Sequence, residues 1–270
     1  MNQWIINANQ AKQLISQGAI ILDVRNKLAW FIGHIPNAIH VNWQDFSQRE
    51  KPHRGKLLED TNILQQKLRE IGVCNSKPVI VIGNPADNFG EEGRIVWMLR
   101  TLGHNSAACV DGGYNALVKV IATTYGVNQP PEIGDFIVNR TPLWEIKRDE
   151  LKANLTENKL IVIDTREKRE YEGATPYGEQ RRGHIPGAVH FYFKDLIDSQ
   201  GDLLKNEEII SKLAILGIEF DTPVAAYCTG GIRSAFFVAV LANLGFKNVK
   251  NYAGSMWEWS AESANSYPLQ

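Results

Sequence analysis

The sequence predicts an α/β protein made of two similar domains, each a parallel sheet flanked by helices, joined by a linker. Two observations predict this fold: an internal repeat, and a regular alternation of strand-like and helix-like segments within each half. The length of 270 residues agrees with it, because that length suits two domains of ordinary size, each with its own core.

The repeat consists of an Asp-x-Arg motif followed by a Gly-His-Ile-Pro-x-Ala motif. The first copy occupies residues 23–25 and 33–38, and the second occupies 164–166 and 183–188. Apolar runs at 78–82 and 223–227 follow in the same order. A duplication of this kind predicts two copies of one fold along the chain.

Within the first copy, short apolar runs alternate with segments of helical period. The expected elements are a strand at 19–24, a helix at 61–71, a strand at 79–82 and a helix at 94–102. Strands that alternate with helices in this way are parallel, and reactive groups then lie where a strand's carboxyl end turns into a helix. The junctions after Ile82 and Tyr227 are therefore the places to look for chemistry.

A stretch with little periodicity, containing two glycines and two prolines, separates the halves. We expect domains at 1–123 and 142–270, with 124–141 as the linker.

Bulk properties exclude several classes of function. A formal net charge of -1 provides no general attraction to nucleic acid or to an anionic membrane. The sequence shows neither a basic leader nor an apolar run of bilayer-spanning length, so we expect a cytoplasmic protein, and we expect a monomer. Three cysteines without a close pair suggest neither a disulfide framework nor a cysteine metal site, and no cofactor is indicated.

The duplication separates structural features from chemical ones, because features present in both halves serve the fold. Histidines of the repeat are expected to pack or hydrogen-bond rather than to bind metal, and the Asp-x-Arg motifs are expected to form pairs at strand ends. The residues concerned are His34, His40, His184, His190, Asp23, Arg25, Asp164 and Arg166.

One junction carries a feature that its counterpart lacks. Cys228 follows the apolar run at 223–227 and opens the loop Cys-Thr-Gly-Gly-Ile-Arg, whereas Gly83 stands at the matching position of the first half. The two glycines allow successive backbone N–H groups to point inward at the start of a helix, which lowers the pKa of a thiol. Cys228 is therefore the predicted nucleophile, and Cys74 and Cys109 are expected to be structural.

These motifs, together with the segment 252–259 and its Gly-Ser-x-Trp sequence, resemble the rhodanese family in their usual order over nearly the whole chain. The resemblance implies an inactive N-terminal domain and a catalytic C-terminal domain, with a persulfide formed on Cys228. It implies a sulfur-binding loop that Ser255 approaches, and the loop consists of Thr229, Gly230, Gly231, Ile232 and Arg233.

Four residues separate Cys228 from Arg233, whereas the resemblance to cysteine phosphatases of the same fold would call for five. The shorter loop suits a single sulfur atom, so we expect a sulfurtransferase. Its expected donor is a small anion, thiosulfate, and its acceptor is cyanide, a thiol or a protein. A 3-mercaptopyruvate sulfurtransferase and a persulfide carrier or redox interaction module are the alternatives.

Two arginine roles remain open in the sequence. Arg233 either anchors the donor's sulfonate or braces the loop through an internal ion pair. Arg182, with Arg181, ends a segment that only the second half has, where the pair either guides an anionic donor or is simply exposed. Glu170 stands where animal thiosulfate enzymes of this family carry an arginine, so a familiar anion contact is in doubt.

Overall fold

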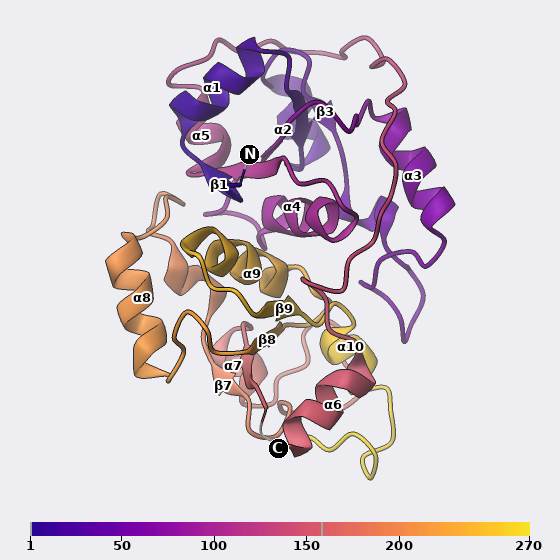
Figure 1. Ribbon diagram of the computed structural model, residues 1–270, viewed down its shortest axis with the longest axis vertical. Coiled ribbons are helices and arrows are strands. Elements are labelled where there is room, and N and C mark those ends of the chain that lie inside the picture. The colour runs from indigo at the N-terminus through magenta and orange to yellow at the C-terminus, as the bar shows by residue number, and fades with distance from the viewer. Residues whose placement is uncertain (1, 158) are drawn as a thin grey trace. The chain divides into compact units, whose positions relative to one another are not determined.

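The computed structural model describes residues 2–157 and 159–270, and they form two compact units (Figure 1). The first unit comprises Met1–Phe46, Leu58–Thr141 and Ile197–Leu203. The second comprises Ser47–Leu57, Pro142–Leu196 and Leu204–Gln270. Each half of the chain thus contributes one short segment to the other unit.

The first unit contains a five-stranded parallel sheet with the order β1-β5-β4-β2-β3. Its strands are β1 (Ile5–Ile6), β2 (Ile20–Asp23), β3 (Ile39–His40), β4 (Val79–Ile82) and β5 (Ala107–Val110). Its helices are α1 (Ala8–Ser16), α2 (Lys27–Ile32), α3 (Thr61–Glu70), α4 (Glu91–Thr101) and α5 (Gly113–Leu117), with a 3₁₀ turn at Trp43–Phe46.

Alternating residues of β4 explain how this sheet is covered. Ile80 and Ile82 face a core shared with Ala11 of α1 and Leu117 of α5. Every residue of β4 is buried, as expected for a central strand with helices on both faces.

The second unit repeats this plan with a four-stranded parallel sheet of order β7-β6-β8-β9. Its strands are β6 (Ile161–Asp164), β7 (Val189–His190), β8 (Val224–Tyr227) and β9 (Val249–Asn251). Its helices are α6 (Arg148–Thr156), α7 (Lys168–Tyr171), α8 (Asn206–Ile215), α9 (Arg233–Leu244) and α10 (Ser255–Trp259), with a 3₁₀ turn at Phe193–Leu196.

The two faces of the second sheet are covered by different helices. Tyr227 and Ala225 of β8 share a core with Leu151 of α6 and Met256 of α10. Helix α9 runs along the other side of β8 and β9 (Figure 1). The prediction of parallel sheets flanked by helices is confirmed in both units.

The segment 124–141, predicted as a linker, packs along the first unit. Phe136 is fully buried, and its N–H donates to the carbonyl of Val73 at 3.2 Å. Asn139 donates in the same way to Leu102 at 2.9 Å. A segment without regular structure is therefore held by backbone hydrogen bonds.

The repeated histidines and Asp-x-Arg motifs hold the strand ends together. His34 Nδ1 and His184 Nδ1 lie 2.8 and 3.0 Å from backbone carbonyls, and each ring stacks on a neighbouring aromatic ring. Arg166 binds both carboxylate oxygens of Asp164 and the carbonyl of Gly183, as Arg25 does with its own counterparts. The structural interpretation of these residues is confirmed.

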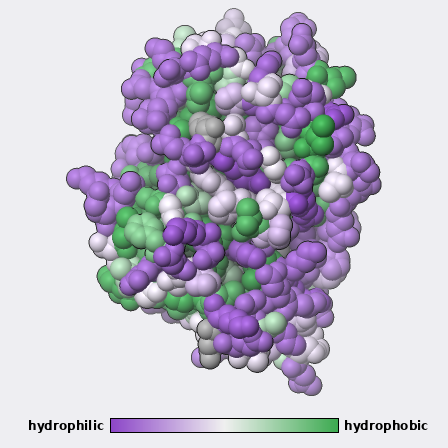
Figure 2. Space-filling model, viewed as in Figure 1, coloured by the Kyte–Doolittle hydropathy of each residue, from purple (hydrophilic) through white to green (hydrophobic). Residues whose placement is uncertain are grey.

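Most of the face shown in Figure 2 is hydrophilic, with hydrophobic residues in smaller groups. In the described part of the chain, every helix is too short or too polar to cross a bilayer.

Candidate active site

Cys228 lies directly after β8, and α9 begins five residues later at Arg233. The connecting loop needs both of its glycines. Gly231 has a φ of +81°, and a Cβ there would lie 2.6 Å from the backbone of Ala253. A Cβ on Gly230 would lie 2.2 Å from the ring of Trp257. The loop can therefore close tightly around one sulfur atom.

Amide groups of the loop point toward the sulfur, and its carbonyls point away. The N–H of Gly231 donates to Cys228 Sγ at 3.1 Å, and Ser234 Oγ lies 3.6 Å from the same sulfur. The carbonyls of Cys228 and Thr229 instead accept hydrogen bonds from the first turn of α10. Cys228 is only 1% exposed, yet it lies in a polar anion-binding loop and not in apolar packing.

This environment lowers the pKa of the Cys228 thiol below its ordinary value. Burial alone would raise the pKa, but the charge of Arg233 and hydrogen bonds from Ser234 and Gly230 outweigh it. Cys109, equally buried but without such partners, has a pKa raised well above the ordinary value by burial. Of these two buried thiols, Cys228 is the one whose pKa is lowered, which favours its thiolate.

We expect the alkylation of Cys228 to follow a pH profile whose midpoint lies below that of an ordinary thiol. The thiolate is the reactive form, and it is lost only as pH falls through the lowered pKa. Ser234→Ala should move the midpoint to higher pH, because it removes a hydrogen bond to the thiolate. Iodoacetamide labelling of the Cys228 peptide, quantified by mass spectrometry across pH, measures this. Ser211→Ala, an exposed serine of α8, is the control, and a wild-type midpoint at the ordinary value would contradict the expectation.

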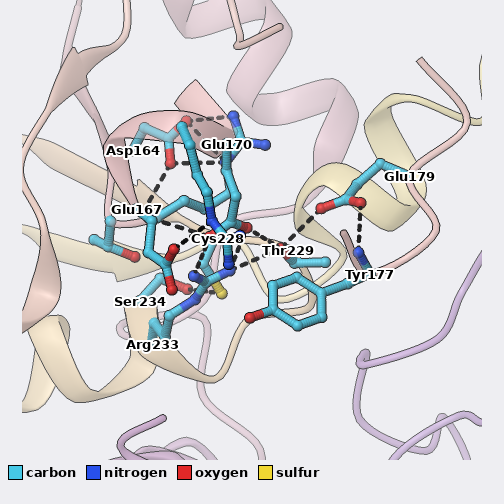
Figure 3. A network of polar contacts seen from close by, with 12 residues as sticks. Asp164, Glu167, Glu170, Tyr177, Glu179, Cys228, Thr229, Arg233 and Ser234 are labelled. Carbon is cyan, nitrogen blue, oxygen red and sulfur yellow. Dashed lines mark hydrogen bonds and ion pairs between the residues drawn. The ribbon is translucent and has the colours of Figure 1, made fainter. Parts of the chain in front are cut away.

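Arg233 braces the loop from within. Its Nη1 and Nη2 bind Glu170 Oε2 and Oε1 at 2.6 and 2.8 Å, and both side chains are almost fully buried (Figure 3). Burial would raise the pKa of Glu170, but Arg233 lowers it below its usual value. The guanidinium thus forms the internal ion pair that is one of the two roles that the sequence left open.

Thr229 joins this pair to a second carboxylate. Its hydroxyl lies 3.0 Å from Glu170 Oε1 and 3.1 Å from Glu179 Oε1, and it accepts a hydrogen bond from Arg233 Nη2 at 2.8 Å. Figure 3 shows the side chains of Glu170 and Glu179 reaching Thr229 from different segments. The first residue of the loop after the cysteine is therefore fixed by side chains from α7 and from the segment that only the second half has.

The far side of the loop is held by β9 and α10. Asn251 Nδ2 donates to the carbonyl of Gly231 at 3.1 Å, and its Oδ1 accepts from Ser234 Oγ at 2.7 Å. Ser255 Oγ accepts from the N–H of Cys228 at 3.1 Å and donates to Tyr252. Ser255 therefore supports the backbone of the cysteine.

The structure brings together the loop residues Thr229 to Arg233 and Ser255, but not Arg182. Arg182 is exposed, and within the described chain its side chain has no hydrogen bond or ion pair with the loop. Its neighbour Arg181 binds the carbonyls of Trp259, Ser260 and Tyr267, so it stabilises the end of α10.

Sequence reasoning missed the partners that hold the loop. Glu170, Glu179 and Asn251 are buried polar residues that contact it. The signal for Glu170 was its departure from the family pattern, which was interpreted as a lost anion contact. Glu179 and Asn251 had no signal, because each lies far from Cys228 along the chain.

A glutamate side chain lies beside Gly83 at the matching junction of the first unit. The carboxylate of Glu92, in the first turn of α4, fills the space beside Gly83, so that a Cβ on Gly83 would lie 1.9 Å from Glu92 Oε2. Burial raises the pKa of Glu92 to about 7. Thus a buried carboxyl group occupies the place that the cysteine side chain takes in the second unit.

Comparisons with known proteins agree with this arrangement. A family model described as "Rhodanese-like domain" matches residues 7–119 and 147–262. A 3-mercaptopyruvate sulfurtransferase of Escherichia coli (strain K12) is 29% identical over 234 residues, which cover 86% of this chain and 82% of the relative. A thiosulfate sulfurtransferase of Pseudomonas aeruginosa is 28% identical over 249 residues, with 92% and 90% covered.

Solved structures resemble the chain over a similar extent. The crystal structure of SseA from Escherichia coli, titled as a "Rhodanese" fold of 3-mercaptopyruvate sulfotransferases, has a TM-score of 0.79 and 25% identity. The match covers 94% of this chain and 98% of that one. The crystal structure of YnjE, at 20% identity and a TM-score of 0.85, supports the fold alone, over 98% of this chain and 68% of its own.

Proposed function

Because this chain belongs to the rhodanese family and is a sulfurtransferase, we propose that it carries sulfur as a persulfide on Cys228. The observation that supports this most directly is the hydrogen bond from the N–H of Gly231 to Cys228 Sγ, within a loop whose amides face inward. A thiolate held in this way is a ready nucleophile, and the same amides suit the terminal sulfur of a persulfide.

The proposed cycle has two half-reactions. The Cys228 thiolate attacks the outer sulfur of thiosulfate, an S–S bond forms, the bond to the sulfonate sulfur breaks with its electron pair, and sulfite leaves. The persulfide anion then gives its outer sulfur to cyanide, a thiol or an acceptor protein, and the thiolate is restored. Neither half-reaction needs a metal or an organic cofactor.

Residues around the loop have separate tasks in this cycle. Inward amides, including that of Gly231, stabilise the anionic sulfur in both half-reactions. Arg233 favours the anion by its charge and holds the loop by its pair with Glu170. Ser255 holds the amide of Cys228. Arg182 remains a predicted contact for the donor.

Thiosulfate as the donor is tested by loading and turnover. Incubation of the purified chain with thiosulfate should add the mass of one sulfur atom to the Cys228 peptide, and cyanide should remove it with release of thiocyanate. Mass spectrometry detects the first step, and colorimetry detects the second. A Cys228 peptide that stays unmodified by thiosulfate would contradict the proposal.

A 3-mercaptopyruvate donor is the second candidate, because relatives with either name resemble the chain to nearly the same extent. That donor presents a carboxylate in place of a sulfonate, and pyruvate would leave in place of sulfite. The ratio of kcat/KM for the two donors decides between them. A persulfide carrier would differ from both, with slow turnover of small donors and rapid exchange with one partner. Within the proposal the chain acts as a monomer in the cytoplasm.

A further inference from the structure

A basic loop from the N-terminal half of the chain belongs to the catalytic unit. The loop is Ser47–Leu57, and an antiparallel bridge between its two end residues closes it. Within it the N–H of Gln48 donates to Lys56 at 2.8 Å, and the N–H of Gly55 donates to Gln48 at 3.1 Å. Its basic residues are Arg49, Lys51, His53, Arg54 and Lys56.

This basic loop is fastened beside the sulfur-binding loop. Gly55, with a φ of +89°, packs so closely on Gly230 that a Cβ would lie 2.4 Å from the carbonyl oxygen of Gly230. Lys56 Nζ binds Glu258 Oε1 at 2.9 Å, and Lys51 Nζ binds the carbonyl of Gly178 at 2.9 Å. These three contacts fix the position of the basic loop next to the sulfur-binding loop.

Arg54 is held on an aromatic platform at this place. Its guanidinium carbon lies 4.3 Å from the ring centroid of Trp257. Trp257 is fixed in turn, because its Nε1 donates to Tyr177 at 3.0 Å and its backbone N–H donates to Thr229 at 2.9 Å. The same ring lies against Gly230. A guanidinium stacked on a ring keeps the N–H groups at its edge available for an oxyanion.

Other basic groups around this site have carboxylate or carbonyl partners. Arg233 binds Glu170, Arg181 binds three carbonyls, and Lys56 binds Glu258. Arg54 is exposed, and among the described residues it makes no ion pair. The guanidinium of Arg54 therefore has N–H groups available for a ligand. Only the ring of Trp257 separates it from Gly230 of the sulfur-binding loop.

We infer that Arg54 is the donor-recognition residue of this enzyme and binds the oxyanion end of the sulfur donor, while the donor's outer sulfur reaches Cys228. This inference rests on the proposed function and adds a residue to it from the other half of the sequence. A planar guanidinium binds a sulfonate or a carboxylate through two parallel N–H···O contacts. Arg54 thus selects anionic donors, whereas Arg233 maintains the loop.

The test is Arg54→Gln in the full chain, assayed with thiosulfate and with an alkyl hydropersulfide, a sulfur donor that carries no oxyanion. Loss of charge-assisted hydrogen bonds should raise KM for thiosulfate roughly 10- to 100-fold, with kcat changed less than about threefold. The hydropersulfide should load Cys228 at the wild-type rate, because it has no sulfonate or carboxylate for Arg54 to bind. Arg54→Lys should recover only part of the KM, since an ammonium group cannot make the bidentate contact.

Arg49→Gln is the matched control, because it removes the same charge from the same loop at another exposed position. Its KM for thiosulfate should stay within about twofold of wild type, since salt screens the general effect of a surface charge on an anionic donor. An unchanged KM in Arg54→Gln, or an equal rise in Arg49→Gln, would overturn the role of Arg54. A wild-type chain that neither donor loads would instead overturn the proposed function.

Discussion

Cys228→Ser should lower sulfur transfer from thiosulfate by at least about 10³-fold, because a serine hydroxyl neither ionises near neutral pH nor forms a persulfide. The loop itself should survive, since the serine oxygen can still accept the hydrogen bond from Gly231. Steady-state thiocyanate formation measures the loss, and mass spectrometry of the thiosulfate-treated variant should find no added sulfur.

Cys74→Ser is the control for this variant. Cys74 is a partly exposed cysteine of the first unit, and its sulfur contacts a backbone carbonyl there. The same chemical change at Cys74 should leave turnover near the wild-type value. Turnover that persists in Cys228→Ser would remove Cys228 from the mechanism, whatever the loop geometry.

Glu170→Gln should lower the free energy of unfolding by about 3–5 kcal/mol, because it leaves the buried charge of Arg233 without its counter-charge. Both side chains are at most 4% exposed, so water does not replace the lost partner. Denaturant titration of the two proteins at neutral pH measures the difference. Sulfur loading of the variant should fall as well, because Glu170 also contacts Thr229 in the loop.

The pH dependence of this difference gives its electrostatic part. Arg233 lowers the pKa of Glu170 in the folded protein, so the pair stabilises the fold above the pKa of an unfolded glutamate, ~4.3, and this contribution is lost as pH falls through the lowered pKa. The difference in free energy of unfolding between wild type and Glu170→Gln should therefore become smaller at acidic pH.

Glu167→Gln is the matched control on the same short segment. Glu167 pairs with the largely exposed Arg169, and such surface pairs contribute little to stability because water solvates and salt screens both charges. If Glu170→Gln lowered the free energy of unfolding no more than Glu167→Gln does, the bracing role of the buried pair would be contradicted.

Much of the fold was predictable from the sequence because the chain contains two copies of the same domain. The strand expected at 79–82 is β4, Val79–Ile82, and the helix expected at 61–71 is α3, Thr61–Glu70. The contrast between Gly83 and Cys228 indicated one junction, and two glycines after a buried strand give the backbone the freedom to turn its amides inward.

The contacts that hold the sulfur-binding loop and the basic loop in place could not be predicted in the same way. Glu170 precedes Arg233 by 63 residues and Lys56 precedes Glu258 by 202, and no local pattern joins residues at such separations. The inclusion of Ser47–Leu57 in the second unit depends equally on long-range packing.

The sequence by itself therefore determined the duplicated α/β architecture, and it pointed to Cys228 and to the glycine loop that follows it. Each of these follows from short-range constraints: side-chain period, backbone freedom and the position of a residue after a strand. Only the tertiary structure decided that Arg233 braces the loop, that Glu92 fills the matching place in the first unit, and that Arg54 lies on Trp257. The role of a charged side chain depends on which groups lie within a few ångströms of it, and only the folded structure sets those distances.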